Sequence, residues 1–217
     1  MVLTVGFEPT TASLPWRNST PEPCQLNIIV EYCKFLNFSF SPFKDHLDAI
    51  SFLKLNHSGH AYGNVTTIDY SSINSYFLEI LSTLNLDIGH SESFHKLPSK
   101  TSIVPHIDIE PSDICKINWV YLGQDSTMNW FNLLPNKQLT KRTNLIGKNF
   151  YSAELSDVYL SHSVNLQGPA LVQVGELHNI TNTKEERFCA SFCIVNKVTR
   201  KRMTFKEASK ILSEFII

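Results

Sequence analysis

The sequence predicts a mainly β fold, a sandwich or barrel with a helical annex. After Ile88, short runs rich in β-branched and aromatic residues follow one another at close spacing. Gly and Pro residues separate these runs, as expected for turns between strands. Many short strands at such spacing favour packed sheets or a barrel over a parallel sheet. The 217 residues suffice for one domain with a sizeable core.

Composition and charge narrow the classes of function. The formal net charge of -1 disfavours a general binder of nucleic acid or of membrane surfaces. No uninterrupted apolar run approaches the ~20 residues that a membrane-spanning helix needs. The five cysteines are odd in number and include no C-x-x-C pair, and no secretory signal opens the chain. We therefore expect a protein of a reducing, cytoplasmic compartment.

Residues 1–24 differ in composition and periodicity from the rest of the chain. They are rich in Pro and Thr and show no period of 2 or 3.6. The segment G-F-E-P-T-T, residues 6–11, resembles the product of an open reading frame that runs through a tRNA gene. We interpret residues 1–24 as an appended leader and residues 25–217 as the domain; an ordered N-terminal arm is the alternative.

Residues 25–95 are predicted to form an N-terminal helical support. Within them, residues 64–70 carry β-branched side chains that favour a strand. Beyond Ser72, a residue suited to an N-cap, apolar residues recur at helical spacing and predict an amphipathic helix packed on a sheet. These residues are Ile73, Phe77, Ile80, Leu81 and Leu84.

The core is predicted to lie in residues 96–200 and to consist of strands. The runs that favour strands are 102–108, 115–122, 128–134, 158–166, 170–174 and 187–196. A helix over residues 204–216 closes the chain, and Thr204 and Glu207 have the spacing of a capping box at its start.

A candidate metal site begins in V-P-H-I-D-I-E-P, residues 104–111. Residues two apart on a strand point to the same face, so His106 and Asp108 could bind one divalent ion together. Glu110 has the same parity, but Pro111 ends the strand there, and we interpret Glu110 as a loop carboxylate. A third ligand must come from another strand.

His178 is the best candidate for that third ligand. The strand A-L-V-Q-V ends at Gly175, His178 follows, and a polar turn then leads to a strand that begins at Arg187. Such a hairpin would bring Arg187 into the same interior as His178. Because a buried arginine is costly unless an anion meets it, we expect an anion beside Arg187.

The order of these residues resembles the iron(II)/2-oxoglutarate-dependent oxygenases. The family shares H-x-D, a later His and an Arg soon after it. H-N-I-T-N, residues 178–182, is similar to the sequence around the distal His of the family, and G-P-A-L-V, residues 168–172, to the strand before it. The likeness covers residues 98–196. It departs from the family at Leu177, where members often have Pro.

The resemblance implies a double-stranded β-helix, which is a jelly-roll, cupin-like fold. It implies Fe(II) held by His106, Asp108 and His178, the two-His, one-carboxylate set of non-haem iron oxygenases. The cosubstrate 2-oxoglutarate would pair its 5-carboxylate with Arg187, and the Ser191 hydroxyl would add a hydrogen bond. The implied reaction converts 2-oxoglutarate to succinate and CO2 and hydroxylates a second, unidentified substrate.

Other residues have simpler interpretations. Asn118 is polar in an apolar strand and could bind the cosubstrate if its side chain has the right strand parity. The aromatic residues Trp119, Tyr121 and Trp130 are interpreted as core, with a substrate platform as the alternative. Metal binding is not expected at His57, His60, His90 or His95. Cys189 and Cys193 are interpreted as a core thiol and a packing thiol.

Two alternatives to a dioxygenase stay open. The first is a jelly-roll module that binds or supports without catalysis, although an intact ligand set with Arg187 argues against it. The second is a cupin-type metalloenzyme that uses no 2-oxoglutarate, but cupins usually have a second His where Asp108 stands. The sequence does not specify the substrate, which depends on loops such as residues 134–151, a predicted lid. The expected partners are the small-molecule cosubstrate and substrate.

Overall fold

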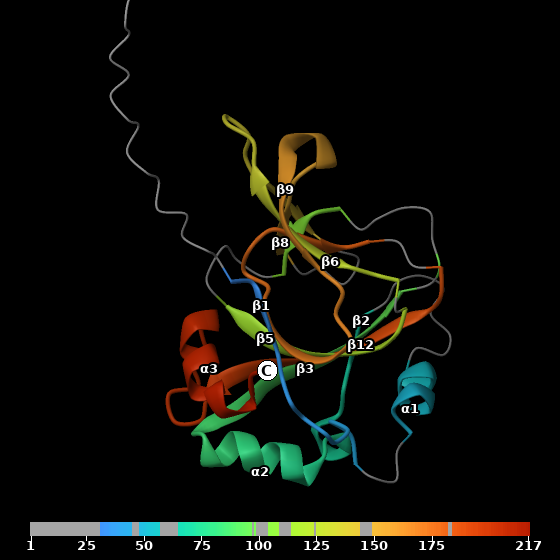
Figure 1. Ribbon diagram of the computed structural model, residues 1–217, viewed down its shortest axis with the longest axis vertical. Helices are drawn as coiled ribbons and strands as arrows, with labels where there is room; N and C mark the ends of the chain where they lie inside the picture. Colours follow the sequence, from blue (N-terminus) through green and yellow to red (C-terminus); the bar gives the residue numbers. More distant parts are fainter. Residues whose placement is uncertain are drawn as a thin grey trace, which may run out of the picture. The chain divides into compact units, whose positions relative to one another are not determined.

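Two antiparallel sheets of six strands each make up most of the fold (Figure 1). The first sheet has the strand order β1-β10-β5-β12-β3-β2, and the second has the order β7-β8-β4-β11-β6-β9. Every strand pair in the described part of the chain is antiparallel. The fold is therefore mainly β, as predicted, and is consistent with a β-sandwich.

The structure is a computed structural model. It describes residues 31–44, 48–56, 65–96, 98, 104–108, 114–123, 125–143, 149–181 and 184–217. The expected leader, residues 1–24, lies outside these residues, as do Glu110, His57 and His60, so the predictions for them stay predictions. Within the described residues, no helix is long and apolar enough to cross a membrane.

The strands vary in length from two to eleven residues. The first sheet contains β1 (Cys33–Phe35), β2 (Val65–Thr67), β3 (Leu86–Lys96), β5 (Cys115–Leu122), β10 (Gly168–Gln173) and β12 (Arg187–Asn196). The second contains β4 (His106–Ile107), β6 (Met128–Leu133), β7 (Thr140–Thr143), β8 (Asn149–Ser152), β9 (Val158–Val164) and β11 (His178–Ile180). The helices are α1 (Ala49–Asn56), α2 (Ser75–Thr83) and α3 (Phe205–Ile211), with short 3-10 turns at Tyr70–Ser72, Leu155–Asp157 and Ser213–Phe215.

The helices cover one face of the first sheet, and the second sheet lies on its other side (Figure 1). Side chains alternate along a strand, and the even-numbered residues of β12 from Phe188 to Ile194 are apolar and fully buried. They belong to one core cluster with Phe77 and Leu81 of α2 and Ala208 of α3. This apolar face of the first sheet is where the helices dock.

The opposite face of the first sheet carries both apolar and polar side chains. A second core cluster joins Val120 of β5 and Val172 of β10 to Met128 and Trp130 of β6 in the other sheet. The Trp130 indole also donates a hydrogen bond of 2.8 Å to the carbonyl of Gln173, which links the two sheets. The polar residues on this face belong to the candidate site.

Several predicted elements are confirmed. β5 and β12 have the predicted ends, and β6 and β9 end one and two residues earlier than predicted. β10 begins two residues and ends one residue earlier than predicted. The capping box is present at α3: the Thr204 hydroxyl accepts from the Glu207 amide at 3.1 Å, and the Glu207 carboxylate accepts from the Thr204 amide at 3.1 Å. The run 102–108 forms a strand only at β4 among its described residues.

The prediction of a helical support over residues 25–95 is wrong for much of that region. It contains α1 and α2, but also β1, β2 and β3, and β3 is the partner of β12 along its whole length. The strand expected at 64–70 is limited to β2, because a 3-10 turn begins at Tyr70. Helix α2 begins later than predicted, with Asn74 and not Ser72 as the N-cap; the Asn74 side chain accepts from the Tyr76 amide at 2.9 Å.

Two segments predicted to be irregular contain strands. The predicted lid at 134–151 includes β7 and β8, which pair with each other, and β8 pairs with β4. The turn expected after His178 starts later, since β11 extends to Ile180 and pairs with both β4 and β6. Both segments therefore contribute to the second sheet.

Candidate metal centre

The two predicted histidine ligands lie on neighbouring strands of the second sheet. β11 pairs with β4 so that His178 lies directly opposite His106. Directly opposed residues of an antiparallel pair project from the same face, and the two imidazole centroids are 4.7 Å apart. Strand pairing alone therefore brings the two histidines together.

Asp108, directly after β4, completes the group. Its Oδ1 atom lies 3.4 Å from His106 Nε2 and 3.5 Å from His178 Nε2. One donor atom from each residue lies within 4.8 Å of the other two. Two ligands that bind an ion at right angles, each ~2.0–2.2 Å from it, lie about 3 Å apart. Small shifts would thus let Oδ1 and both Nε2 atoms share one ion.

Backbone carbonyls orient both imidazole rings. His106 Nδ1 lies 3.0 Å from the Val104 carbonyl, and His178 Nδ1 lies 2.8 Å from the Glu176 carbonyl. Because a carbonyl oxygen only accepts, each Nδ1 carries a proton and donates it. In a neutral ring the Nε2 lone pair is then free to bind a metal. The tautomers thus fit the predicted ligand set.

Lys116 of β5 reaches from the first sheet to Asp108. Its ammonium donates to Asp108 Oδ2 at 2.7 Å and lies 3.4 Å from Glu92 Oε2. Glu92 in turn lies 2.7 Å from His90 Nε2 through its other oxygen. Lys116 is buried, with 6% of its side chain exposed, so its charge depends on these two carboxylates. Asp108 Oδ1 remains on the side of the two histidines.

The charges of this group shift one another. Burial by itself would raise the pKa of Asp108, but the Lys116 ammonium and the two imidazoles hold that pKa well below its ordinary value. Burial lowers the pKa of His106, yet Asp108 and the Val104 carbonyl outweigh burial and raise it. Lys116 is desolvated too, and Asp108 and Glu92 keep its pKa above the ordinary value. Asp108 is therefore an anion at neutral pH, ready to bind a cation.

Arg187, the first residue of β12, is 5% exposed. Its Nε–H is buried and makes no hydrogen bond within the described residues. Burial lowers the pKa of the guanidinium, and the Cys189 side chain lies beside it. No carboxylate among the described residues lies within the 4.0 Å of an ion pair. The expected anion beside Arg187 is thus not supplied by this part of the chain.

Asn118 and Ser191 lie on the same face of the first sheet as Arg187. They are directly opposed on β5 and β12, and the Ser191 hydroxyl donates to Asn118 Oδ1 at 2.7 Å. Both are buried. The side chain of Asn118 therefore projects from the face that its predicted role in binding the cosubstrate requires. Its amide oxygen already accepts a hydrogen bond from the Ser191 hydroxyl.

The remaining candidates lie outside the metal group. Trp119 is in the core beneath the helices, Tyr121 packs at the edge of that core, and Trp130 is fully buried between the sheets. His90 contacts Glu92, and the His95 ring stacks on Phe188 at 4.3 Å between centroids. Among the described residues, the cysteines at 33, 115, 189 and 193 form no disulfide.

Two buried lysines of the site were not predicted from the sequence. Lys96 is the last residue of β3 and Lys116 is the second residue of β5, and a lysine near a strand end usually lies in solvent. The one available signal for Lys116 is its spacing of two from Asn118, which puts both side chains on one face of β5. Lys96 has no comparable signal, because its position depends on the register between β3 and β12.

Models of protein families and curated protein sequences give no match to this chain.

Proposed function

We propose that the protein is an Fe(II)/2-oxoglutarate-dependent dioxygenase built on a double-stranded β-helix. The pairing of eight strands supports this fold. The pairs are β3 with β12, β4 with β11, β5 with β10 and β6 with β9. In chain order, the first of these eight strands thus pairs with the last, the second with the seventh, and so on inward. This nested pairing, split alternately between two sheets, is expected for a jelly roll.

The observation that supports the function is the joint presence of a possible facial ligand set and a buried arginine that pairs with no described carboxylate. His106, Asp108 and His178 offer two nitrogens and one oxygen on one side of a common point, the donor set of non-haem Fe(II) oxygenases. Arg187 is buried on the facing sheet with no carboxylate partner among the described residues. A metal centre alone would not require such an arginine, whereas a cosubstrate with a distal carboxylate would.

Each group of the chain has a defined task in this proposal. His106 and His178 present Nε2 because the carbonyls of Val104 and Glu176 hold Nδ1. Lys116 holds Asp108 Oδ2, which leaves Oδ1 for the metal. Bound Fe(II), together with 2-oxoglutarate and O2, supplies the oxidising chemistry that hydroxylates a substrate while releasing succinate and CO2.

The net charge of the buried groups is consistent with these ligands. Asp108 and Glu92 contribute two negative charges, and Lys116, Arg187 and Lys96 contribute three positive ones, so these five groups sum to +1. A divalent cation and the dianion 2-oxoglutarate sum to zero, so together they leave this buried charge unchanged. The excess positive charge favours a site that takes up an anion along with the metal.

The test is calorimetric titration of 2-oxoglutarate into the anaerobic, Mn(II)-loaded protein. We expect binding by the parent and a loss of roughly 30-fold or more in Arg187→Ala, since removing one member of a buried charge pair costs ~2–5 kcal/mol. Arg187→Lys should fall between, because it keeps the charge and loses the planar fork. Arg200→Ala, which removes an exposed arginine, is the matched control and should bind like the parent. A parent that binds no 2-oxoglutarate would contradict the proposal.

A further inference from the structure

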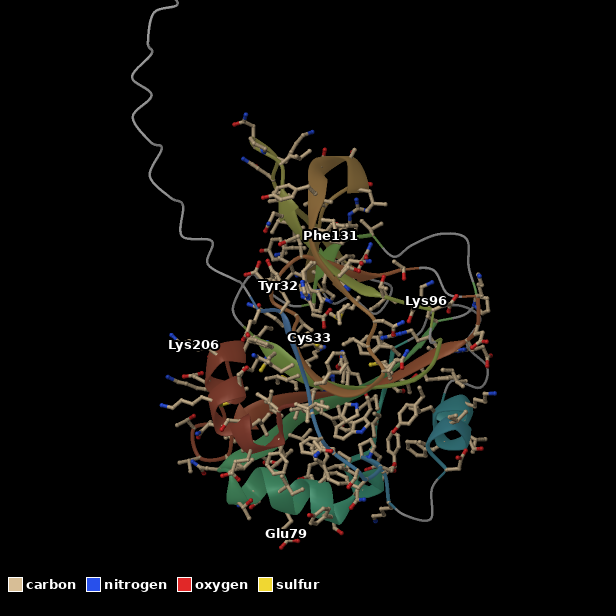
Figure 2. The ribbon with its side chains drawn as sticks, in the orientation of Figure 1. Tyr32, Cys33, Glu79, Lys96, Phe131 and Lys206 are labelled. Carbon is tan, nitrogen blue, oxygen red and sulfur yellow. The ribbon has the colours of Figure 1, made fainter. Side chains whose placement is uncertain are left out.

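Lys96 and Arg187 place two positive charges side by side on the inner face of the first sheet. They are directly opposed where β3 ends and β12 begins, so their side chains project from the same face. Lys96 is 9% exposed and Arg187 is 5% exposed. Figure 2 labels Lys96 on the side of the domain from which β12 starts.

Neither cation meets a carboxylate in the described part of the chain. Lys116, on the same face, contacts both Asp108 and Glu92, whereas no ion pair joins Lys96 or Arg187 to a described acid. Burial lowers the pKa of Lys96, and the neighbouring guanidinium of Arg187 lowers it further. Two buried like charges next to each other are unfavourable unless an anion lies between them.

The backbone also fixes the arginine of this pair. Gly123 follows β5 with φ +60, and a Cβ atom built there would lie 2.7 Å from Arg187 Cβ. The turn therefore packs against the base of the Arg187 side chain, which a larger residue would displace. The polar Ser191 lies four residues further along β12, on the same face.

We propose that Lys96 and Arg187 together form an oxyanion site in which Lys96 is a second cationic anchor. The identity of the oxyanion rests on the proposed function: it is the 5-carboxylate of 2-oxoglutarate. Arg187 binds this carboxylate through its planar guanidinium, and Lys96 attracts it as a point charge. Lys96 then favours cosubstrates that end in a carboxylate over 2-oxo acids that end in a methyl group.

The site is tested first without metal. Glutarate, which has the distal carboxylate but no 2-oxo group, and inorganic phosphate are added separately to the metal-free protein in a buffer free of other oxyanions. Glutarate should raise the melting temperature of the parent and of Lys201→Met, an exposed lysine used as control, but not of Lys96→Met. Without added anions, Lys96→Met should melt no lower than the parent, because it removes a buried like charge. A glutarate effect absent from the parent, or equal in parent and Lys96→Met, would overturn the proposal. A phosphate effect that exceeds the glutarate effect would overturn the assignment to a carboxylate.

The second arm separates Lys96 from the rest of the cosubstrate site. In Mn(II)-loaded protein, Lys96→Met should weaken 2-oxoglutarate binding at least about tenfold and leave 2-oxopentanoate binding unchanged. Lys96→Arg, which keeps the charge, should retain most of the 2-oxoglutarate affinity and guards against a folding defect. Equal weakening of both 2-oxo acids would refute a role for Lys96 at the distal carboxylate. If glutarate acts through Lys96 but the Mn(II)-loaded parent binds no 2-oxoglutarate, the oxyanion site stands and the dioxygenase function fails.

Discussion

At the scale of single residues, Asp108 is shared between two kinds of positive partner. One oxygen faces the two histidines and the other accepts from Lys116. Because Lys116 comes from the first sheet and Asp108 follows a strand of the second, this contact also ties the sheets together. Lys116 is therefore both an orienting group for Asp108 and a stabilising contact of the metal-free protein.

Replacing Lys116 with Met should destabilise the metal-free protein by about 3 kcal/mol at pH 7, since it leaves two carboxylates without their buried partner. A carboxylate whose pKa is lower in the folded than in the unfolded state stabilises the fold at pH values above its unfolded-state pKa. This stabilisation is lost as the pH falls through the folded-state pKa. Because the pKa of Asp108 is lowered, the difference in the free energy of unfolding between parent and variant should become smaller below about pH 4. Urea unfolding at several pH values measures this difference. Lys54→Met, which removes an exposed ion pair, should change stability by less than about 1 kcal/mol.

The raised pKa of His106 predicts the pH dependence of metal binding. A histidine must lose its proton to bind a metal, and His106 holds that proton to a higher pH than an ordinary histidine does. Affinity for Mn(II) should therefore already fall as the pH drops below about 7 and decline steeply through 6. Calorimetric titrations between pH 6 and 8 measure this. An affinity that stays constant over that range is incompatible with His106 as a ligand.

The group of candidate ligands could be predicted from the sequence because its signals are the spacing and the order of residues. His106 and Asp108 are two apart on a strand, and the type and order of His178 and Arg187 match the resembled family. The contacts of Lys116 with Asp108 and of Lys96 with Arg187 could not be predicted in the same way. They depend on which strands face or adjoin each other, and a single lysine in a strand looks like a solvated one.

At the scale of elements, strands that are buried on both faces are the ones that the sequence predicts best, because they contain long apolar runs. β5 and β12 are central in the first sheet, and their long apolar runs gave the predicted ends. β3 is central too, but Gly89 and several polar residues interrupt its pattern, since its inner face carries Glu92 and Lys96. β7 is exposed along its whole length and has no apolar signal at all.

Helix α3 provides a test at this scale. The Thr204 cap and Glu207 satisfy each other's amides at its start, and Ala208 of the helix is buried against the first sheet. Thr204→Ala should lower the free energy of unfolding by about 1 kcal/mol, because it leaves a helix N–H without its acceptor. Thr204→Ser keeps the acceptor and should lose only a few tenths of that amount. Chemical denaturation measures both, and equal losses would show that the hydroxyl cap is not the cause.

At the scale of the whole molecule, the two faces of the first sheet divide the tasks. One face binds the helices through an apolar core, and the other carries charged groups toward the second sheet. The mainly β class followed from the spacing of the strands, but the inclusion of β2 and β3 in the first sheet did not. That pairing is long-range, and local periodicity does not specify it.

Metal binding should stabilise the domain as a whole. Two of the candidate ligands lie on β4 and β11, and the third, Asp108, directly follows β4 and is linked to the other sheet by Lys116. An ion that binds these residues only in the folded state adds to its stability. The melting temperature should rise with Mn(II) concentration in the parent and not in Asp108→Asn. A rise of the same size in both proteins would place the ion elsewhere.

The metal centre itself is tested most directly by anaerobic titration with Co(II), followed by its visible absorption. We predict one Co(II) per chain in the parent and in His162→Ala, a partner of Trp130 on the second sheet that is not a ligand. Asp108→Asn and His178→Ala should each lose this stoichiometric site. The account is contradicted if the parent binds no Co(II), or if Asp108→Asn and His178→Ala bind it with the same spectrum and affinity as the parent.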